Sequence, residues 1–295
     1  MHKSVNATIF ESVRPTLLGL AYRILGSFAD AEDAVQDTFV DWTNAKHESI
    51  DNPQGWLTTT CTRRCLDLLR AAHRTRVNYV GAWLPEPVQV PVERNSEADM
   101  ELAASLKTAF LLVLERLTPR ERAAYLLHEV FEMPYPEVAE TLDTTESACR
   151  QLVSRAKSHL DQSQTRFTTP VERQDELLTA FQAAITEGSI GRLASLLAVD
   201  VQLTADGGGK VPTIRKVLRG MEAVTTFLTR SLHEYWSGLQ WNVVDVNGER
   251  GVVLTDQGRV DAVVSFAYDQ TGKATDVFIV RNPDKLGNLR EISLH

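Results

Sequence analysis

The chain has 295 residues, of which 43% are hydrophobic and 24% charged, so it can form two or three domains and is not disordered as a whole. No apolar stretch reaches the roughly 18 to 20 residues of a membrane span, and the start lacks an apolar signal core. We therefore expect a soluble cytoplasmic protein without a membrane partner. The net charge is −8, but five acids and no base lie between Asp30 and Asp41, and five arginines and one acid between Arg63 and Arg76. Because acidic and basic residues are clustered separately, we expect an acidic and a basic surface that bind different partners.

Residues 8–76 carry the pattern of a helical bundle. Apolar residues recur at helical spacing between Arg14 and Phe28, and Gly26 can end that helix. Asp30 offers the N-cap of a second helix, which has one clean apolar stripe. Asn52 followed by Pro53 predicts the start of a third helix.

The third helix has an apolar stripe and an arginine-rich face. Its arginines can serve a phosphate backbone or form a solvated face, and Trp56 near its start can either stack on single-stranded bases or pack in the core. The stripe contains Cys61 and Cys65. With Cys149 the chain has three cysteines, and no zinc spacing is present, so we expect buried thiols and no metal.

Residues 77–100 interrupt the helical pattern. The segment Trp83-Leu-Pro-Glu-Pro87 cannot continue a helix, and Pro91 follows it. We predict a largely extended linker. It should not be fully solvated, because Trp83 and Leu84 are unfavourable in water.

Residues 101–165 predict a second helical block. Its first helix begins near Leu102, and Thr118-Pro119 starts the next one with Glu121 in the capping-box position. A short helix after Pro134, a turn at Asp143 and a longer helix from Glu146 to about Leu160 form a helix-turn-helix.

The longer helix of that motif has a polar face suited to DNA. Arginine can form two hydrogen bonds with guanine, glutamine can do so with adenine, and serine can contact bases or phosphates. The alternative is an ordinary solvated helix face. The capped helix upstream and the basic end at Arg155 favour DNA. The candidate reading residues are Ser147, Arg150, Gln151, Ser154 and Arg155.

Residues 172–295 predict an α+β domain with helices on a curved antiparallel sheet. Helices are expected at 175–187, 190–198 and 221–235. Strand-like runs follow at 241–246, 252–255, 260–268 and 275–280, separated by turns such as Asn247-Gly248. The segment Asp206-Gly-Gly-Gly-Lys210 lacks the ending of a phosphate loop, so we expect a tight turn held by an Asp–Lys pair.

The order of these motifs resembles the two-domain extracytoplasmic-function sigma factors of the sigma-70 family. The residues that carry the resemblance are the acidic helix Asp30–Phe39, Asn52-Pro-Gln-Gly-Trp-Leu57, the arginine-rich helix, and Leu117-Thr-Pro-Arg-Glu-Arg122 before the helix-turn-helix. It implies two all-α sigma domains, a region 2 bundle (8–76) and a region 4 helix-turn-helix (101–165), joined by the linker. Asp143 stands where such turns often have glycine, a departure that the left-handed tolerance of aspartate makes small.

The resemblance also implies partners and roles. The partners are promoter DNA and the β′ clamp and β flap of core RNA polymerase, with no cofactor. Region 4 would read the −35 element through the helix from Glu146. The residues implied to bind core polymerase are Asp30, Glu32, Asp33, Gln36 and Asp37. Those implied to open and read the −10 element are Asn52, Trp56, Arg63, Arg70, Arg74 and Arg76.

Three further segments resemble sigma factors with a fused SnoaL-like domain of the nuclear-transport-factor-2-like fold, here residues 172–295. They are Trp83-Leu-Pro-Glu-Pro87, Asp206-Gly-Gly-Gly-Lys210 and Asn282-Pro-Asp-Lys-Leu286. In such proteins the extension itself acts on the sigma core. The residues that this comparison marks as regulatory are Trp83, Leu84, Pro85, Asp206, Lys210, Asn282, Asp284 and Lys285.

Two alternatives remain at this stage. The third domain could regulate, with or without a small ligand, or it could be an enzyme that uses Asp206, His233, Asp245 or Asp261, although no pair of these has diagnostic spacing. Regulation without catalysis is the expectation. The whole chain could instead be a one-component helix-turn-helix regulator with a ligand-sensing or enzymatic domain, but the acidic helix and the first arginine-rich block would then have no role.

Overall fold

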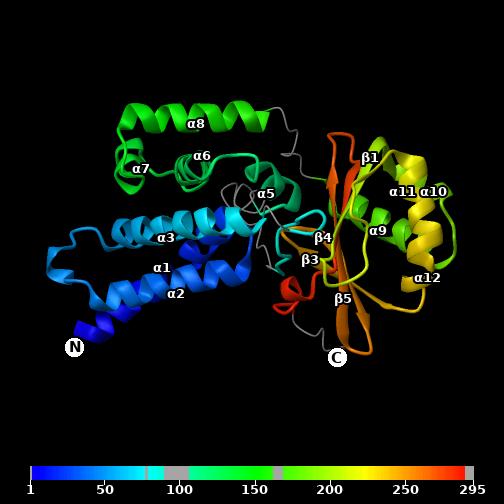
Figure 1. Ribbon diagram of the computed structural model, residues 1–295, viewed down its shortest axis with the longest axis horizontal. Coiled ribbons are helices and arrows are strands. Elements are labelled where there is room, and N and C mark those ends of the chain that lie inside the picture. Colours follow the sequence, from blue (N-terminus) through cyan, green and yellow to red (C-terminus); the bar gives the residue numbers. More distant parts are fainter. Residues whose placement is uncertain (1, 77–78, 90–105, 162–168, 290–295) are drawn as a thin grey trace. The chain divides into compact units, whose positions relative to one another are not determined.

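The computed structural model describes residues 2–76, 79–89, 106–161 and 169–289 (Figure 1). The chain forms two compact units, Met1–Val77 with Val113–Ser163, and Asn78–Leu112 with Gln164–His295. Each is described by itself. Among the described residues, no helix is both long and apolar enough to span a bilayer.

The first unit is all-helical, as predicted. Its first three helices are α1 (His2–Leu25), α2 (Phe28–Asn44) and α3 (Pro53–Arg76), with a 3₁₀ turn at His47–Ser49. Gly26 ends α1 with a φ of 69°. The predicted N-cap of α2 is wrong: the cap is Ser27, whose hydroxyl accepts from the Asp30 backbone N–H at 3.2 Å. Asp30 lies in the first turn of the helix instead.

The remaining helices of this unit contain the helix-turn-helix. They are α6 (Pro119–Tyr125), the π-helical segment η2 (Leu126–Val130), α7 (Tyr135–Thr141) and α8 (Glu146–Asp161). The predicted capping box of α6 is present: the Glu121 N–H donates to the Thr118 hydroxyl, and the Thr118 N–H donates to the Glu121 carboxylate. Helix α5 (Thr108–Leu114) carries the chain from the second unit into the first. The start predicted for this helix near Leu102 lies outside the described residues.

The second unit is an α+β domain with one six-stranded sheet of order β2-β1-β6-β5-β4-β3. Helices α9 to α12 lie on one face of the sheet (Figure 1), and a 3₁₀ turn, η4 (Pro283–Lys285), follows β6. The strands are β1 (Leu197–Asp206), β2 (Leu218–Arg219), β3 (Gln240–Val246), β4 (Glu249–Asp256), β5 (Arg259–Tyr268) and β6 (Ala274–Val280). The helices are α9 (Val171–Thr186), α10 (Gly191–Leu196), α11 (Met221–Thr226), η3 (Phe227–Leu232) and α12 (His233–Trp236).

The sheet differs from the prediction in two strands. The sequence patterns indicated β3 to β6 but neither β1 nor β2, and they indicated an antiparallel sheet. Strand β1 pairs in parallel with β6, so that Leu203 lies opposite Val277. The sheet is therefore mixed. The helix expected at 190–198 ends at Leu196, where the chain enters β1.

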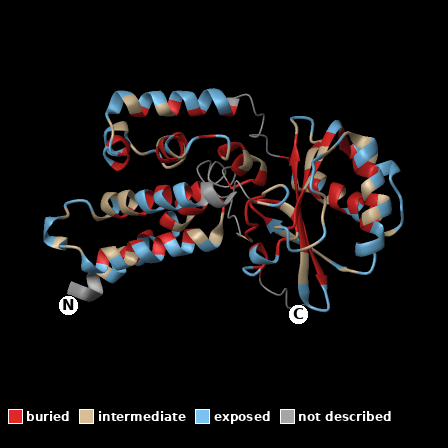
Figure 2. Ribbon diagram, viewed as in Figure 1, coloured by how far each residue is buried: buried red, intermediate tan, exposed pale blue. Residues whose placement is uncertain are grey.

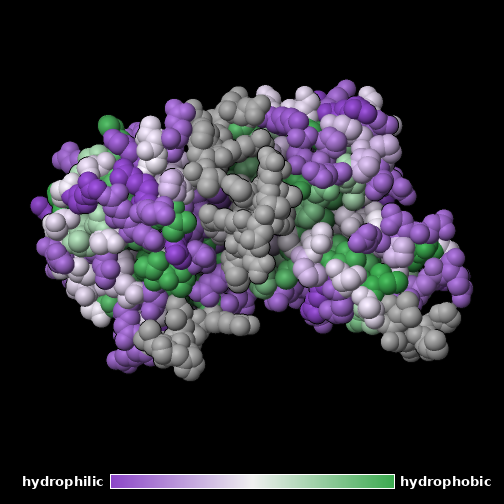
Figure 3. All heavy atoms as spheres, turned by 180° about the vertical axis from the view of Figure 1, so that it is seen from behind, coloured by the Kyte–Doolittle hydropathy of each residue, from purple (hydrophilic) through white to green (hydrophobic). Residues whose placement is uncertain are grey.

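Both faces of this sheet are covered. The larger core lies under the helices and includes Phe181, Trp236 and Phe266. The opposite face has a second core cluster, in which Leu84 of the linker packs with sheet residues and with Leu286 and Leu289, and Ala109 and Leu112 of α5 pack against its edge. Figure 2 shows the strands largely buried, whereas the helices alternate between buried and exposed positions. On the face drawn in Figure 3, hydrophobic residues form separate patches among hydrophilic ones.

Candidate nucleic-acid interface and linker-binding site

The helix-turn-helix presents its predicted reading face to solvent. Asp143 takes a φ of 48°, the left-handed conformation that the turn requires, and the Thr145 hydroxyl accepts from the Ala148 N–H at 3.2 Å. Cys149, Val153, Ala156 and Leu160 bury the other face of α8. All five candidate residues are exposed: Ser147, Arg150, Gln151, Ser154 and Arg155.

The start of α3 is shaped by Asn52. Its side-chain oxygen accepts from the Gly55 N–H at 3.0 Å, so Asn52 acts as the cap of the helix. A Cβ at position 55 would lie 2.7 Å from the Asn52 amide nitrogen, which explains the glycine. Trp56 is half-buried and lies 5.5 Å from the ring of Trp42, which is fully buried and donates to the Asn6 carbonyl. Trp56 is therefore supported by the core while part of its surface stays accessible.

The arginines of α3 have different partners. Arg63 donates to the carbonyls of Glu140 and Thr141 at the end of α7, at 2.9 and 3.1 Å. Arg70 forms an exposed ion pair with Asp67 at 2.7 Å. The side chains of Arg74 and Arg76 lie outside the described residues. The Arg63 guanidinium therefore bonds the end of α7, although the residue is exposed.

The acidic face of α2 is accessible. Glu32, Asp33, Gln36 and Asp37 are exposed, and Asp30 is partly buried. The opposite face is buried through Ala31, Ala34, Val35, Thr38 and Trp42. Within the described part of the chain, Asp33 and Asp37 form no salt bridge.

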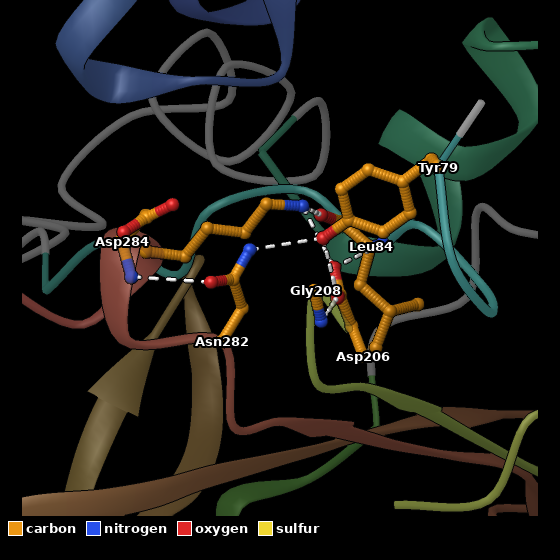
Figure 4. A network of polar contacts seen from close by, with 7 residues as sticks. Tyr79, Leu84, Asp206, Gly208, Asn282 and Asp284 are labelled. Atoms are coloured by element: carbon orange, nitrogen blue, oxygen red, sulfur yellow. Dashed lines mark hydrogen bonds and ion pairs between the residues drawn. The ribbon is translucent and has the colours of Figure 1, made fainter. Parts of the chain in front are cut away.

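A buried carboxylate joins the linker to the sheet of the second unit (Figure 4). Asp206, at the end of β1, is fully buried. One of its oxygens accepts from the Tyr79 hydroxyl at 2.6 Å and from the Gly208 N–H at 2.9 Å. The other accepts from the Leu84 N–H at 3.0 Å and from Lys285 at 2.7 Å. The Asp206 charge is therefore both hydrogen-bonded and paired, as a buried carboxylate must be.

Tyr79 and Lys285 complete this site. Asn282 donates to the Tyr79 hydroxyl at 2.9 Å, while burial, and then the Asp206 carboxylate, raise the pKa of the Tyr79 phenol well above its ordinary value. The hydroxyl therefore stays protonated and donates to Asp206. Lys285 also donates to the Leu84 carbonyl at 2.5 Å, and its ammonium lies 4.3 Å from the centroid of the Trp83 ring.

The predicted ion pair between Asp206 and Lys210 within the turn is wrong. Each of these two residues pairs instead with a residue of the segment 282–286. Asp206 pairs with Lys285, and Lys210 pairs with the exposed Asp284 at 2.5 Å. The turn itself is closed by the Asp206–Gly208 hydrogen bond and by the positive φ values of Gly208 and Gly209. A Cβ on Gly208 would lie 2.5 Å from Asn282 atoms, so this glycine also permits the close approach of the two motifs.

The β3–β4 turn holds the linker at a second place that sequence reasoning missed. The Asn247 side chain accepts from the Val88 N–H and donates to the Leu106 carbonyl, both at 3.0 Å. Next to it, Lys107 and Glu249 form a buried ion pair at 2.8 Å. The sequence identified Asn247-Gly248 only as a turn, and nothing in its pattern indicated these distant partners.

Comparison with known proteins agrees with this architecture. Residues 9–75 match the family described as sigma-70 region 2, and residues 107–160 match sigma-70 region 4. The chain is 36% identical to the ECF RNA polymerase sigma factor SigJ of Mycobacterium tuberculosis over 94% of this chain and 91% of SigJ. It is 29% identical to the probable ECF sigma factor SigI of the same species, over 98% and 97%. The crystal structure of SigJ has a TM-score of 0.74, at 34% identity, and the match covers 97% of this chain and 99% of that one.

The chain belongs to the extracytoplasmic-function family of RNA polymerase sigma factors. Membership of this family argues against the alternative raised from the sequence, a one-component helix-turn-helix regulator. The fold expected from the resemblance, two helical sigma domains followed by an α+β domain, is confirmed by the same comparisons.

The four side chains considered for catalysis in this sigma factor are not brought together. Asp206 is paired with Lys285, His233 contacts the Ile185 carbonyl at 2.6 Å, and Asp261 pairs with Arg281 at 3.0 Å. Asp245 is exposed and lies 3.2 Å from Arg250. Among the described residues, no group of three or more His, Cys, Asp or Glu side chains could hold a metal ion. The three cysteines are free and buried, as predicted.

Proposed function

We propose that this sigma factor directs promoter-specific initiation by reading the −35 element with the exposed face of α8 and the −10 element with the loop before α3 and the helix itself. The observation that carries the −35 assignment is the exposed row of Ser147, Arg150, Gln151, Ser154 and Arg155. The accessible acidic face of α2, with Asp33 and Asp37, supports docking on the β′ clamp of core polymerase.

Run-off transcription with purified core polymerase tests this function. Promoter-dependent transcripts should require the protein. Reversal of both Asp33 and Asp37 to lysine should abolish co-purification with the core enzyme and leave folding intact, because surface substitutions usually change stability by about 0.5 kcal/mol or less each. Normal core binding by the double variant would remove the basis for the docking face.

We further propose that the C-terminal domain acts in cis and without catalysis, through its hold on the linker. The supporting observation is the buried contact of Asp206 with Tyr79, the Leu84 N–H and Lys285. Because breaking such a contact releases the linker, a full-length Asp206→Asn variant should shift promoter activity in the same direction as deletion of residues 172–295.

The matched control for Asp206→Asn is Lys210→Gln. The Lys210–Asp284 ion pair joins the same two segments, 206–210 and 282–286, but it is exposed, so its loss should have little effect. Wild-type transcription by both the Asp206→Asn variant and the deletion would refute regulation by this domain.

We also propose that a small ligand binds in a pocket of about 410 Å³, whose lining residues Pro283 and Leu286 lie in the same segment as Lys285. Its lining includes Arg259 and Arg281 against one acid, Asp261, together with Pro283 and Leu286. The balance of charge favours a small organic anion. Thermal stabilisation by such an anion should disappear in Arg259→Ala, whose side chain is exposed and so not needed for folding.

A further inference from the structure

The guanidinium of Arg150, on the reading face of α8, is held from two directions although it is exposed. Its central carbon lies 4.2 Å from the centroid of the Tyr135 ring. Its Nη2 donates to Glu146, one turn earlier in α8, at 2.5 Å. The side chains of Arg150 and Glu146 are 58% and 45% exposed, so burial does not fix this arrangement.

Tyr135 is itself fixed by its place at the start of α7 and by one other element, η2. It is the first residue of α7, directly after Pro134, and its ring stacks on His128 of η2 at 3.7 Å with an interplanar angle of 30°. The His128 ring is held in turn by a contact between Nδ1 and the Met133 carbonyl at 3.0 Å. The ring under Arg150 is therefore a preformed platform in the helix-turn-helix.

The chemistry of the guanidinium explains what such a platform can do. Its five N–H donors lie in its plane, whereas an aromatic ring contacts its face. Stacking on Tyr135 thus restricts the side chain without using a donor. Glu146 takes one donor edge, which leaves the remaining N–H groups for the O6 and N7 acceptors of a guanine.

We propose that Tyr135 is a positioning residue for base reading. Its ring orients the Arg150 guanidinium so that the N–H donors are preorganised for a guanine of the −35 element. This rests on the proposed reading of that element by α8. Without the ring, Arg150 would have to lose its rotamer freedom on binding, and the discrimination between guanine and other bases would fall.

The test uses the full chain assembled with core polymerase. A preferred −35 element is selected from a randomised promoter pool, and binding is measured to it and to versions in which each guanine is replaced in turn. Arg150→Ala should identify the guanine that it reads. Tyr135→Leu should lower discrimination at that same guanine by about tenfold, and Tyr135→Phe, which keeps the ring, should stay within about twofold of wild type.

The outcomes separate the two proposals. Unchanged discrimination in Arg150→Ala would refute the reading role of Arg150 on which the inference rests. Loss in Arg150→Ala with wild-type discrimination in Tyr135→Leu would refute the positioning role alone. The double variant Tyr135→Leu/Arg150→Ala should lose no more discrimination at that guanine than Arg150→Ala alone, because Tyr135 acts through Arg150. If Tyr135→Leu has a lower melting temperature than wild type, Tyr135→Met removes the ring in the same way and takes its place. An equal loss of binding to every promoter version would contradict the positioning role and indicate a merely structural one.

Discussion

At the scale of single residues, Asp206 is a fully buried carboxylate that accepts from four donors. A fully buried carboxylate is tolerated only when its charge and its lone pairs are satisfied. Asp206 meets both conditions with donors from the linker (Tyr79 and Leu84), from its own turn (Gly208) and from Lys285. The same residue therefore contributes to the folding of the domain and to the retention of the linker.

We expect Asp206→Asn to lower the free energy of unfolding of the full chain by about 3 kcal/mol, because it leaves the buried Lys285 ammonium without a counter-charge. Chemical denaturation followed by circular dichroism measures the change. Lys210→Gln, which breaks an exposed ion pair, should lower it by about 0.5 kcal/mol at most. Equal effects of the two substitutions would show that burial does not govern this site.

At the scale of elements, the caps decide where helices begin. The N-cap of α2 is Ser27 and not Asp30, because the serine hydroxyl accepts the free Asp30 N–H while the aspartate lies within the first turn. Both are residue types that favour helix starts, so composition alone does not distinguish them. Three-dimensional geometry does.

The cap assignment predicts a difference between two alanine substitutions. Ser27→Ala removes a capping hydrogen bond and should cost about 1 kcal/mol of stability. Asp30→Ala removes only a favourable charge near the helix N-terminus, worth about 0.3 to 1 kcal/mol at low salt. Raising the salt concentration should reduce the Asp30→Ala effect and leave that of Ser27→Ala, and the reverse pattern in thermal melts would return the cap to Asp30.

Local signals predicted most helices and four strands, but long-range pairing was beyond them. Strand β1 carries alternation in Val201, Leu203 and Ala205, which a period-two search would have found. Its parallel pairing with β6 depends on residues more than 70 positions away. The same limit applies to the sites: Asp206 could be singled out as a motif residue, whereas its pairing with Lys285 and the role of Asn247 are set by the fold.

At the scale of the whole molecule, region 2 and region 4 share one compact unit. The Thr59 and Thr141 hydroxyls lie 2.9 Å apart, and Arg63 donates to the end of α7. The −10 and −35 elements are separated by about 25 base pairs, or roughly 80 Å of B-DNA. Because Arg63 of α3, which is proposed to bind the −10 element, donates to the end of α7, we predict that α3 and α7 separate on the promoter.

A cross-link should capture the closed arrangement. In a Thr59→Cys/Thr141→Cys variant the two thiols replace neighbouring hydroxyls, and the native Cys61, Cys65 and Cys149 are buried. Oxidation should abolish run-off transcription and reduction should restore it, while each single variant stays active under both conditions. Full activity of the oxidised and demonstrably cross-linked protein would mean that α3 and α7 need not part.

The Asn247 amide has a topological consequence. The Asn247 side chain bonds the Val88 N–H and the Leu106 carbonyl, and the Asn247 backbone N–H donates to the Val88 carbonyl at 2.9 Å, so one residue holds two distant points of the chain. The number of residues between Val88 and Leu106 therefore does not set the distance between these two points. For a flexible loop, closure entropy varies with the logarithm of length, so inserting four glycine and serine residues should cost only a few tenths of a kcal/mol. Transcription from promoters of fixed spacing should then be insensitive to the insertion in the wild type and more sensitive to it in Asn247→Gly, which loses both side-chain hydrogen bonds and keeps only the backbone bond to Val88.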